Sequence, residues 1–519
     1  MPSAVAEASA SRTPPSGSAG DAATAAAAPP TPPRLRINFP PVKDKTQLAT
    51  EQRAAVGQAE IRGDMERDIP PVIRSVLELA HLTMSGHSQW LRAAPGYQGG
   101  LFHKGEPFCF ASGYRDTSRP LDAEDKGNHM KLKDPLIYGT LSLPITAAYL
   151  CELHGRDVFN LERPLVDYLP ELHGKLADDV TGRRLLAFTH GIDDAHLLAD
   201  AGARWWRPCL SPAMCAETRT HVYDAVDRFL AGGTTTTTAQ LTGQQQRSNL
   251  VQYIRSAPRI TRSFARPPRR CSISHTSVAL LLAAVETRLA GRSFEEDIRK
   301  VVFEPAQSHG SGYGAPSLWK DPNELFYQPT GQAHQHTSFK RPLPIGDRRN
   351  CGPALWNGSM NLYAPAEDYG KLLMLSLDTI ADARELLGKP TNVGRHAHYD
   401  FGVEYLPSKD QLQLTKAVLH GIDALPAVAS FRYNCAHDLG CFGIASCGTR
   451  GARLFVNNLS GIIQHLFVKH VLAKGIDPAA PANLDDPAKA EAEAETIERV
   501  VKKQKFTSYF TKYEAHRRY

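Results

Sequence analysis

Four polar residues in two separate segments carry the chemistry that this sequence could support. Thr140 and Ser142 precede an apolar run, and Ser274 stands directly before His275. A serine or threonine hydroxyl becomes a nucleophile for acyl transfer when a base lies within hydrogen-bond reach. If the fold brings the two segments together, these residues could form such a pair. The structural alternative is that Ser142 caps a helix through its side-chain oxygen.

Other short motifs favour structural interpretations over chemical ones. A zinc site needs a third ligand and a shaped cage, and the four-residue pattern Ser-x-x-Lys recurs by chance. Evenly spaced cysteines on or beside strands are explained by the burial of small side chains. We therefore predict no metal and no other cofactor from the following residues: Ser317 and Lys320, His334 and His336, His396, His398 and Asp400, and Cys435, Cys441 and Cys447.

An apolar helix must position Thr140 and Ser142. Pro144 falls in its first turn, where a missing N–H group is tolerated. Apolar residues then recur on one helical face, and His154 and Gly155 end the helix. These apolar residues are Ile145, Ala148, Tyr149 and Leu153.

Two further elements precede this helix in the chain. After the segment 69–71, apolar residues recur at helical spacing, which predicts a helix that begins there. The segment from Leu101 to Phe110 reads as two short strands around Lys104 and Gly105, which predicts a β-hairpin. The stripe of the helix consists of Ile73, Val76, Leu77 and Ala80.

The order of these segments resembles the serine β-lactamase and penicillin-binding protein family. Val158 to Pro170 is similar to the family's G-K-L-x-L-D-x-P-V-x-x-Y-L-P run, which follows its buried central helix. Further similar segments occur in the family's order as far as Leu472. They are Arg184–Ile192, Ile273–Glu286, Gly291–Glu296, Phe303–Pro305, Ala366–Leu375, Ala436–Gly440, a strand over Arg453–Asn458 and a helix over Ile462–Leu472.

The resemblance implies an α+β fold, an α/β sandwich in which an antiparallel β-sheet is flanked by helices, beside an all-helical subdomain. We place this domain at residues 69–475, with the helical half at roughly 140–380. A low-complexity insertion at 232–248 is typical of a mobile loop. The flanking segments are a disordered arm at 1–42, a lead-in helix at 43–68 and a charged, aromatic helical tail at 476–519.

The first motif of the family's acyl-transfer chemistry departs from its pattern in this chain. The family's Ser-x-x-Lys spacing puts nucleophile and base on one helical face, one turn apart. Here Thr140 or Gly139 stands at the serine position, depending on a shift of one residue. Leu143 or Ser142 stands at the lysine position. The lysine base is therefore missing.

The second and third motifs depart as well. Where the family supplies a Tyr or Ser base with an Asn, this chain has Ile273, Ser274 and His275. The third motif is Lys or His, then Thr or Ser, then Gly. His437 matches its first position, but Leu439 replaces the glycine and is expected to crowd a substrate. Loss of one group of a catalytic unit lowers the rate by orders of magnitude, and here all three motifs depart.

We therefore expect a catalytically inactive member of this family that serves as a structural or assembly subunit of a larger complex. In such a protein Ser142 is an N-cap and His275 fills the former pocket. The alternative is a serine hydrolase, an esterase or peptidase of the β-lactamase-like type, that uses substituted residues. A third hypothesis is a non-catalytic pocket near His437 that binds a small acidic ligand.

Composition limits the partners and the compartment. The net charge of +6 does not by itself indicate nucleic acid. Nine cysteines without a Cys-x-x-Cys pair are interpreted as reduced thiols of an intracellular protein. The sequence has no secretory pattern at its start and no apolar run of membrane-spanning length. We expect a protein of the cytoplasm, the cytoskeleton or the mitochondrion, and not a secreted one.

Two segments outside the family pattern could bind partners. An arginine run could face an acidic surface such as an acidic protein tail, RNA or anionic lipid, or it forms a solvated face. An aromatic stripe at helical spacing must be buried against its own domain or in the groove of a protein partner. The arginines are Arg255, Arg259, Arg262, Arg266, Arg269 and Arg270, and the aromatic residues are Phe506, Tyr509, Phe510 and Tyr513.

Overall fold

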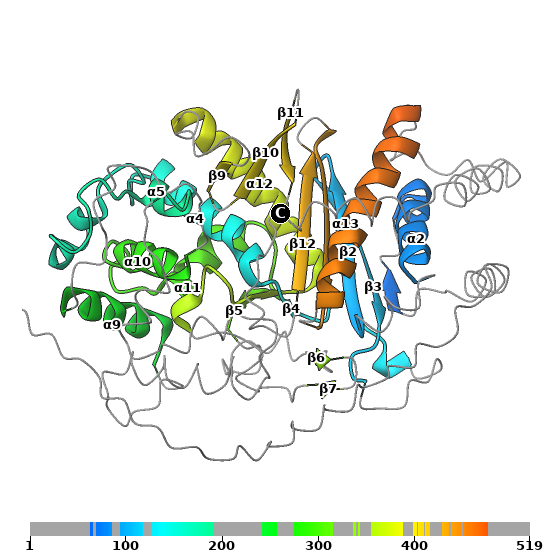
Figure 1. Ribbon diagram of the computed structural model, residues 1–519, viewed down its shortest axis with the longest axis horizontal. Coiled ribbons are helices and arrows are strands. Elements are labelled where there is room, and N and C mark those ends of the chain that lie inside the picture. The colour runs from blue at the N-terminus through cyan, green and yellow to red at the C-terminus, as the bar shows by residue number, and fades with distance from the viewer. Residues whose placement is uncertain are drawn as a thin grey trace, which may run out of the picture. The chain divides into compact units, whose positions relative to one another are not determined.

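An antiparallel sheet of eight strands forms the centre of the computed structural model (Figure 1). Its strand order is β1-β3-β2-β13-β12-β11-β10-β9. The last strand, β13, pairs with β2, so early and late parts of the domain meet in the middle of the sheet. The strands are β1 (Gly63–Met65), β2 (Gly96–His103), β3 (Glu106–Gly113), β9 (His398–Asp400), β10 (Val403–Ser408), β11 (Gln411–Thr415), β12 (Val428–Asn434) and β13 (Leu439–Ala445).

The structure describes fifteen stretches of the chain, and all of them belong to one compact unit, Glu51–Tyr519. The arm at 1–42 and the tail at 476–519 lie outside the described residues. The described stretches are 63–65, 69–85, 94–117, 126–189, 241–256, 274–314, 336–338, 341–342, 354–387, 398–401, 403–408, 411–415, 428–434, 437–447 and 450–475.

The β2–β3 hairpin confirms the prediction made for this segment. Lys104 and Gly105 connect the strands with φ values of 49° and 88°, the left-handed conformation that a two-residue hairpin turn requires. Close approach between strands fixes another glycine, Gly440 on β13. The ring of Phe102 occupies the space where any side chain at position 440 would stand.

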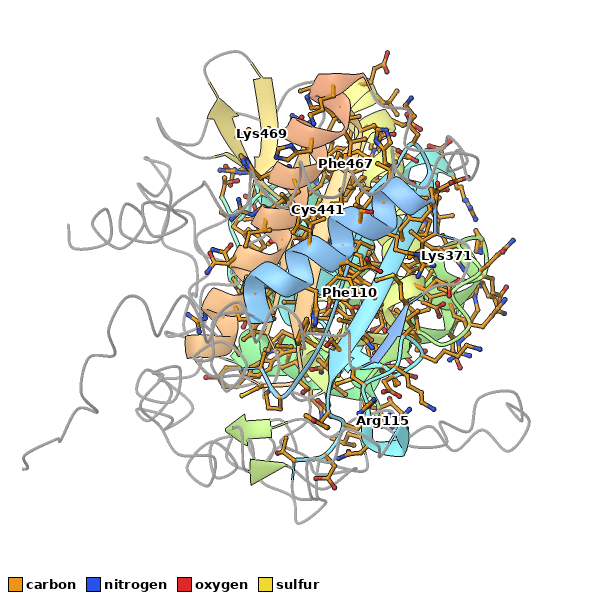
Figure 2. The ribbon with its side chains drawn as sticks, turned by 90° about the vertical axis from the view of Figure 1, so that its right-hand side faces the viewer. Phe110, Arg115, Lys371, Cys441, Phe467 and Lys469 are labelled. Carbon is orange, nitrogen blue, oxygen red and sulfur yellow. The ribbon has the colours of Figure 1, made fainter. Side chains whose placement is uncertain are left out.

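Helices α2 (Pro71–Ser85) and α13 (Arg450–His470) cover one face of the sheet (Figure 2). The helix predicted from the segment 69–71 is α2, and its apolar stripe is buried as predicted. The stripe residues recur every three or four positions, so they fall on one side of the helix, the side that packs on the sheet.

Alternation along β13 separates two cores. Leu439, Cys441 and Ala445 contribute to the core beneath α2 and α13, which we term the outer core. Phe442 and Ile444 contribute to the core on the opposite face, the inner core. Successive side chains of a strand point to opposite faces, so this single strand serves both cores.

The end of the domain differs from the sequence prediction. The prediction of a strand over Arg453–Asn458 is wrong, because these residues lie within α13. Phe455, Val456 and Leu459 recur at helical spacing and are all buried in the outer core. The place of the last strand beside β2 is taken by β13.

The opposite face of the sheet is covered by α12 (Ala366–Leu387), and α4 (Leu143–Gly155) packs against α12. A 3₁₀ turn, η2 (Gly139–Ser142), leads into α4. Pro144 lies in the first turn of α4 and the helix ends at Gly155, as predicted. All of the residues from Leu143 to Cys151 are buried, so α4 is a central core helix rather than an amphipathic surface helix.

The remaining described elements complete the helical half and a small sheet of order β4-β8-β5. No helix of the described residues is long and apolar enough to cross a membrane. The helices are α5 (Gly182–Leu186), α9 (Gly243–Ser256), α10 (His275–Glu286) and α11 (Phe294–Ile298), with the π-helical turn η6 (Arg299–Phe303). The short strands are β4 (Leu136–Ile137), β5 (Gly312–Tyr313), β6 (His336–Ser338), β7 (Arg341–Pro342) and β8 (Leu362–Ala364). The 3₁₀ turns are η1 (Lys126–Asn128), η3 (Leu165–Asp167), η4 (Pro170–Leu172), η9 (Ala354–Trp356) and η11 (Leu472–Lys474).

The predicted lead-in helix and the predicted mobile loop both need correction. Within the lead-in segment 43–68 the structure describes only residues 63–65, which form β1 and pair with β3 instead of forming a helix outside the domain. The mobile loop predicted at 232–248 is wrong for residues 243–248, because α9 begins at Gly243. Leu250, Val251 and Ile254 give α9 a buried face that stabilises these turns.

Candidate functional site

Ser142 lies where η2 meets α4 and is completely buried. Its Oγ lies 2.5 Å from the carbonyl oxygen of Gly139 and 2.6 Å from that of Met360. It also accepts a hydrogen bond from the Leu362 N–H at 3.2 Å. The residue stands at the N-cap position, but its side chain accepts no bond from the helix, so the predicted capping role is wrong. The hydroxyl instead joins the start of α4 to β8.

Residues 354–362, which we term the inner segment, run from η9 into the start of β8 and cross the beginning of α4. The Thr146 hydroxyl donates to the Gly358 carbonyl oxygen at 2.6 Å and lies 3.0 Å from the Tyr313 Oη. The backbone N–H of Tyr138 donates to the Leu362 carbonyl oxygen at 2.8 Å. Together with Ser142, these bonds hold the inner segment against α4 and η2.

His275, at the start of α10, packs against the same segment. Its Nδ1 lies 3.0 Å from the Ser359 Oγ, and its ring centroid is 5.8 Å from that of Trp356. The Ser359 hydroxyl donates its single proton to the Trp356 carbonyl oxygen at 3.0 Å. Both contacts are satisfied when Nδ1 carries a proton and donates to Ser359. In that arrangement His275 cannot remove the Ser359 proton. Ser274 caps α10, since its Oγ accepts from the Ser277 N–H at 3.0 Å.

Two tyrosines stand beside the turn η2 that carries Thr140, and neither can act as a base. Thr140 is 4% exposed, and Leu143 is buried in the inner core. The rings of Tyr138 and Tyr369 stack at 3.7 Å, and the Tyr369 hydroxyl donates to the Leu141 carbonyl oxygen at 3.3 Å. Burial, the largest cause, raises the pKa of both tyrosines well above 10. Both are therefore neutral phenols at physiological pH and cannot act as phenolate bases.

The third motif lies in the turn between β12 and β13 and at the start of β13. His437 is exposed in the turn between β12 and β13. Leu439 is fully buried in the outer core, on the face of the sheet opposite to the inner-core residues Leu141 and Leu143. The Leu439 side chain therefore does not stand on the α4 side of the sheet, and the expectation that it would crowd a substrate stays a prediction. The alternation of β13 turns its side chain away from α4.

Other predicted residues lie apart from the site or outside the described residues. Arg255 is exposed near the end of α9, whereas Ile273, the other five arginines of the run and the four aromatic residues of the tail are not described. His336, His398 and Asp400 lie on β6 and β9. The described residues contain no group of three or more His, Cys, Asp or Glu that could hold a metal ion. Cys441 and Cys447 are both buried.

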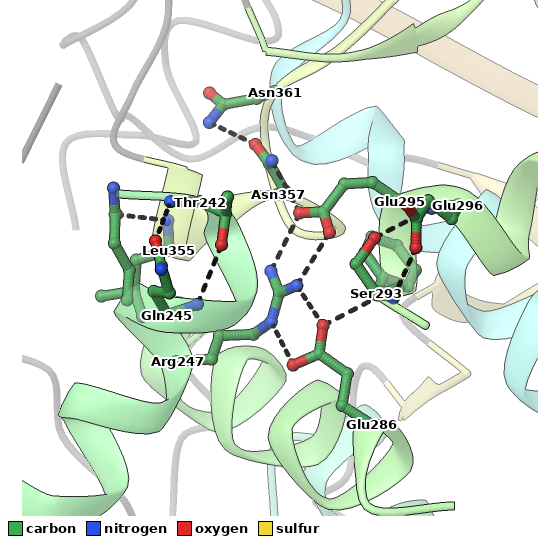
Figure 3. A network of polar contacts seen from close by, with 12 residues as sticks. Thr242, Gln245, Arg247, Glu286, Ser293, Glu295, Glu296, Leu355, Asn357 and Asn361 are labelled. Carbon is green, nitrogen blue, oxygen red and sulfur yellow. Dashed lines mark hydrogen bonds and ion pairs between the residues drawn. The ribbon is translucent and has the colours of Figure 1, made fainter. Parts of the chain in front are cut away.

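Sequence reasoning did not identify a buried ionic network beside the inner segment, centred on Arg247 of α9 (Figure 3). The Arg247 side chain is 0% exposed. Its Nε donates to Glu286 at 3.0 Å, and a terminal nitrogen reaches the other oxygen of that carboxylate. Its two terminal nitrogens also donate to Glu295 at 3.1 and 2.9 Å. One guanidinium thus binds carboxylates from α10 and α11.

Charge and burial together fix the state of this network. Burial works against the charge of Arg247, but Glu295 and Glu286 more than offset it, so the pKa of the guanidinium is raised. Burial also works against the charge of Glu295, but Arg247 and Asn357 hold the pKa of that carboxyl below its ordinary value. Arg247 and Glu295 are therefore both ionised at neutral pH.

The sequence does contain a pattern that could have revealed the network. Arg247, Leu250, Val251 and Ile254 stand at positions i, i+3, i+4 and i+7, which is one face of a helix. A charged residue on an otherwise apolar face must be paired when it is buried. The repetitive composition before Arg247 concealed this pattern and favoured the prediction of a loop.

Comparisons with known proteins agree with this architecture. The sequence profile of the Beta-lactamase family matches residues 89–405, more than half of the chain, so this chain belongs to the beta-lactamase family. The predicted resemblance is thereby confirmed. A comparison with curated proteins finds no match.

Solved structures show a similar fold at low sequence identity. The beta-lactamase from Sulfitobacter sp. EE-36 is 15% identical, with a TM-score of 0.50 over 76% of this chain and 99% of that one. The penicillin binding protein from Bacillus halodurans is also 15% identical, with a TM-score of 0.49 over 75% of this chain and 99% of that one. The mixed fold of helices and antiparallel sheet predicted from the sequence is confirmed.

Proposed function

We propose that this chain is a member of the beta-lactamase family without acyl-transfer activity, and that it serves as a structural subunit of a larger assembly. The observation that carries the proposal is the state of Ser142. Its hydroxyl is buried and bonded to three backbone groups, and the adjacent Leu143 is an apolar core residue.

A nucleophilic hydroxyl must give up its proton to a base and approach a substrate carbonyl. The Ser142 proton points to carbonyl oxygens of Gly139 and Met360, which accept hydrogen bonds but are far too weakly basic to take a proton. No lysine hydrogen-bonds to Thr140 or Ser142 among the described residues, and the nearby phenols are neutral. The proposal is therefore that the family's scaffold is kept while its proton-transfer groups are lost.

The structural role rests on features of the sequence. The arginine run and the aromatic stripe stand outside the family pattern, and both are of types that bind partners. A chain that keeps a large folded domain without its chemistry can still present such segments to other proteins. The proposal places the protein partner at the aromatic residues and an acidic surface at the arginines.

The experiment that tests the proposal has a chemical and an assembly arm. The native protein is treated with a fluorophosphonate probe and a fluorescent penicillin, beside an active beta-lactamase as the positive control. We expect no stoichiometric covalent labelling. Labelling that Thr140→Ala, Ser142→Ala or Ser359→Ala abolishes would overturn the inactive state and favour the alternative, a serine hydrolase with substituted residues.

In the assembly arm, protein lacking residues 506–519 is expressed in the native cells and sedimented in parallel with the full chain. The truncated protein is expected to shift from a heavy fraction to the position of a free subunit. A second variant tests the binding of the arginine run to an acidic surface by the same sedimentation. In it, glutamine replaces Arg259, Arg262, Arg266, Arg269 and Arg270. Sedimentation of the full chain as a free monomer would contradict the structural role.

A further inference from the structure

We infer that Gln246 and Arg247 of α9, with Glu295 and Asn357, form a clasp that holds the inner segment against α4 and keeps the family's site closed. The inference rests on the proposed function, in which the site is closed and inactive, and adds the residues that close it.

The clasp begins with the fixed position of α9. Arg247 binds Glu286 of α10 and Glu295 of α11, so the three helices are joined at one guanidinium. Its guanidinium carbon lies 5.7 Å from the ring centroid of Phe294, which gives the charge a further favourable contact. Lysine could not replace it, because an ammonium group cannot bind two carboxylates side by side in this planar manner.

The inner segment is contacted at two points, once by α11 and once by α9. The Glu295 carboxylate accepts a hydrogen bond from the Asn357 side-chain nitrogen at 2.9 Å, and Asn361 donates to the Asn357 side-chain oxygen at 3.0 Å (Figure 3). The side-chain oxygen of Gln246, the neighbour of Arg247, accepts from the Leu355 N–H at 2.8 Å. The segment is thus held near its beginning and along its middle.

The same segment carries bonds to three side chains of the site. Its residues Met360 and Leu362 bind the Ser142 hydroxyl, Gly358 binds Thr146, and Ser359 binds His275. The clasp and the site therefore lie on two sides of one short stretch of chain. If the clasp is opened, the inner segment loses its support on the α9 side, and its bonds to Ser142 and Thr146 are expected to open more often.

The test is hydrogen exchange measured by mass spectrometry on the full chain with Arg247→Met. This variant leaves the carboxylates of Glu286 and Glu295 without their cation. Peptides covering 136–146 and 354–364 are expected to exchange about tenfold faster or more, because their local opening becomes easier. Peptides from β2, β3 and α13, covering 97–110 and 452–467, lie away from the clasp and are expected to exchange at the wild-type rate. The matched control is Arg255→Met, an exposed arginine of the same helix, for which all four regions should be unchanged.

Wild-type exchange in 136–146 and 354–364 of a folded Arg247→Met protein would overturn the inference. An equal acceleration in 97–110 and 452–467 would overturn it too, because it would show a global loss of stability. If Arg247→Met does not fold, Asn357→Ala decides by the same two criteria, since it breaks the link to Glu295 without stranding a charge next to Arg247.

Probe labelling separates this inference from the proposed function. Absence of labelling in the wild type together with unchanged exchange in the variant overturns the clasp alone. Labelling of Ser142 or Thr140 in the wild type overturns the proposed function, whatever the exchange rates show.

Discussion

The outer and inner cores lie on opposite faces of the same sheet and are built from different chemistry. In the outer core Tyr97 packs its ring 4.6 Å from Phe455 and 6.2 Å from Phe110. A notable polar contact there is the hydrogen bond of 2.5 Å between His81 and the Tyr97 hydroxyl. The inner core combines apolar helices with hydrogen-bonded hydroxyl and amide side chains of the inner segment, η2 and α4.

The two cores therefore differ in how strictly they depend on particular side chains. Apolar burial has no direction, so an outer core tolerates many residues of suitable volume. Hydrogen bonds need a particular partner at a particular angle, so the inner segment depends on single side chains such as Ser142. The resemblance places the family's nucleophile at the start of α4, and in this chain the same place holds a network of bonds to backbone groups.

The largest expected effect concerns the outer core. Phe455→Ala removes a buried ring beside Tyr97 and should lower the free energy of unfolding by about 3–5 kcal/mol, through lost burial and the cavity left behind. The measurement is urea unfolding followed by circular dichroism. The matched control is Lys469→Ala on the exposed side of the same helix, expected within about 0.5 kcal/mol of wild type.

Phe455→Ala also tests whether the two cores are separate. Amide exchange is measured under native conditions in 354–364 and in α13. In 354–364 the rate should rise no more than the loss of global stability predicts, and α13 should show the larger increase. A faster local opening of the inner segment than of α13 would show that the sheet transmits the change, and the comparison of the two cores would fail.

A smaller effect is expected for the inner core. Ser142→Ala leaves the Leu362 N–H without its side-chain acceptor and removes the bonds to Gly139 and Met360. The Leu362 N–H keeps the Met360 carbonyl oxygen as an acceptor at 2.8 Å. The free energy of unfolding should therefore fall by about 0.5–1.5 kcal/mol, the usual net contribution of a lost hydrogen bond. Thr287→Ala, which removes an exposed hydroxyl at the end of α10, is the control. Equal stability of Ser142→Ala and wild type would show that the hydroxyl does not hold the segment.

The sequence predicts the elements with dense apolar periodicity well. The helix with the Ile73 to Ala80 stripe, the hairpin turn at Lys104-Gly105 and the apolar helix that ends at Gly155 are all found. Each depends on residues close together in the chain. The strand predicted over Leu454, Phe455 and Val456 is wrong, because a short apolar run fits a strand as well as a helix.

From the sequence, the site could be predicted only through the catalytic groups of the family that this chain lacks. The contact between Ser142 and Met360 joins residues 218 positions apart, and that between Arg247 and Glu295 joins residues 48 apart. No periodicity links such pairs in a single sequence. Leu439 shows the same limit, since the face on which it lies depends on the register of β13 against β2.

The smallest expected effect is a pH dependence carried by Glu295. Its pKa in the folded protein is lowered from the ordinary value of 4.5, chiefly by Arg247 and Asn357 acting against burial. The resulting stabilisation is fully present above pH 4.5 and is lost as the pH falls through the lower folded value, because the unfolded chain then binds the proton more readily. The difference in unfolding free energy between wild type and Glu295→Gln should therefore shrink as the pH is lowered from 6 to about 3.

The outer core provides the contrast for this last measurement. Phe455→Ala removes no charge, so its difference from wild type should keep a constant size over the same pH range. Glu304→Gln, an exposed carboxylate after η6, should stay within about 0.5 kcal/mol of wild type. A pH-independent difference for Glu295→Gln would mean that the carboxylate has no special partner in the folded state, and the ionic character of the inner network would have to be abandoned.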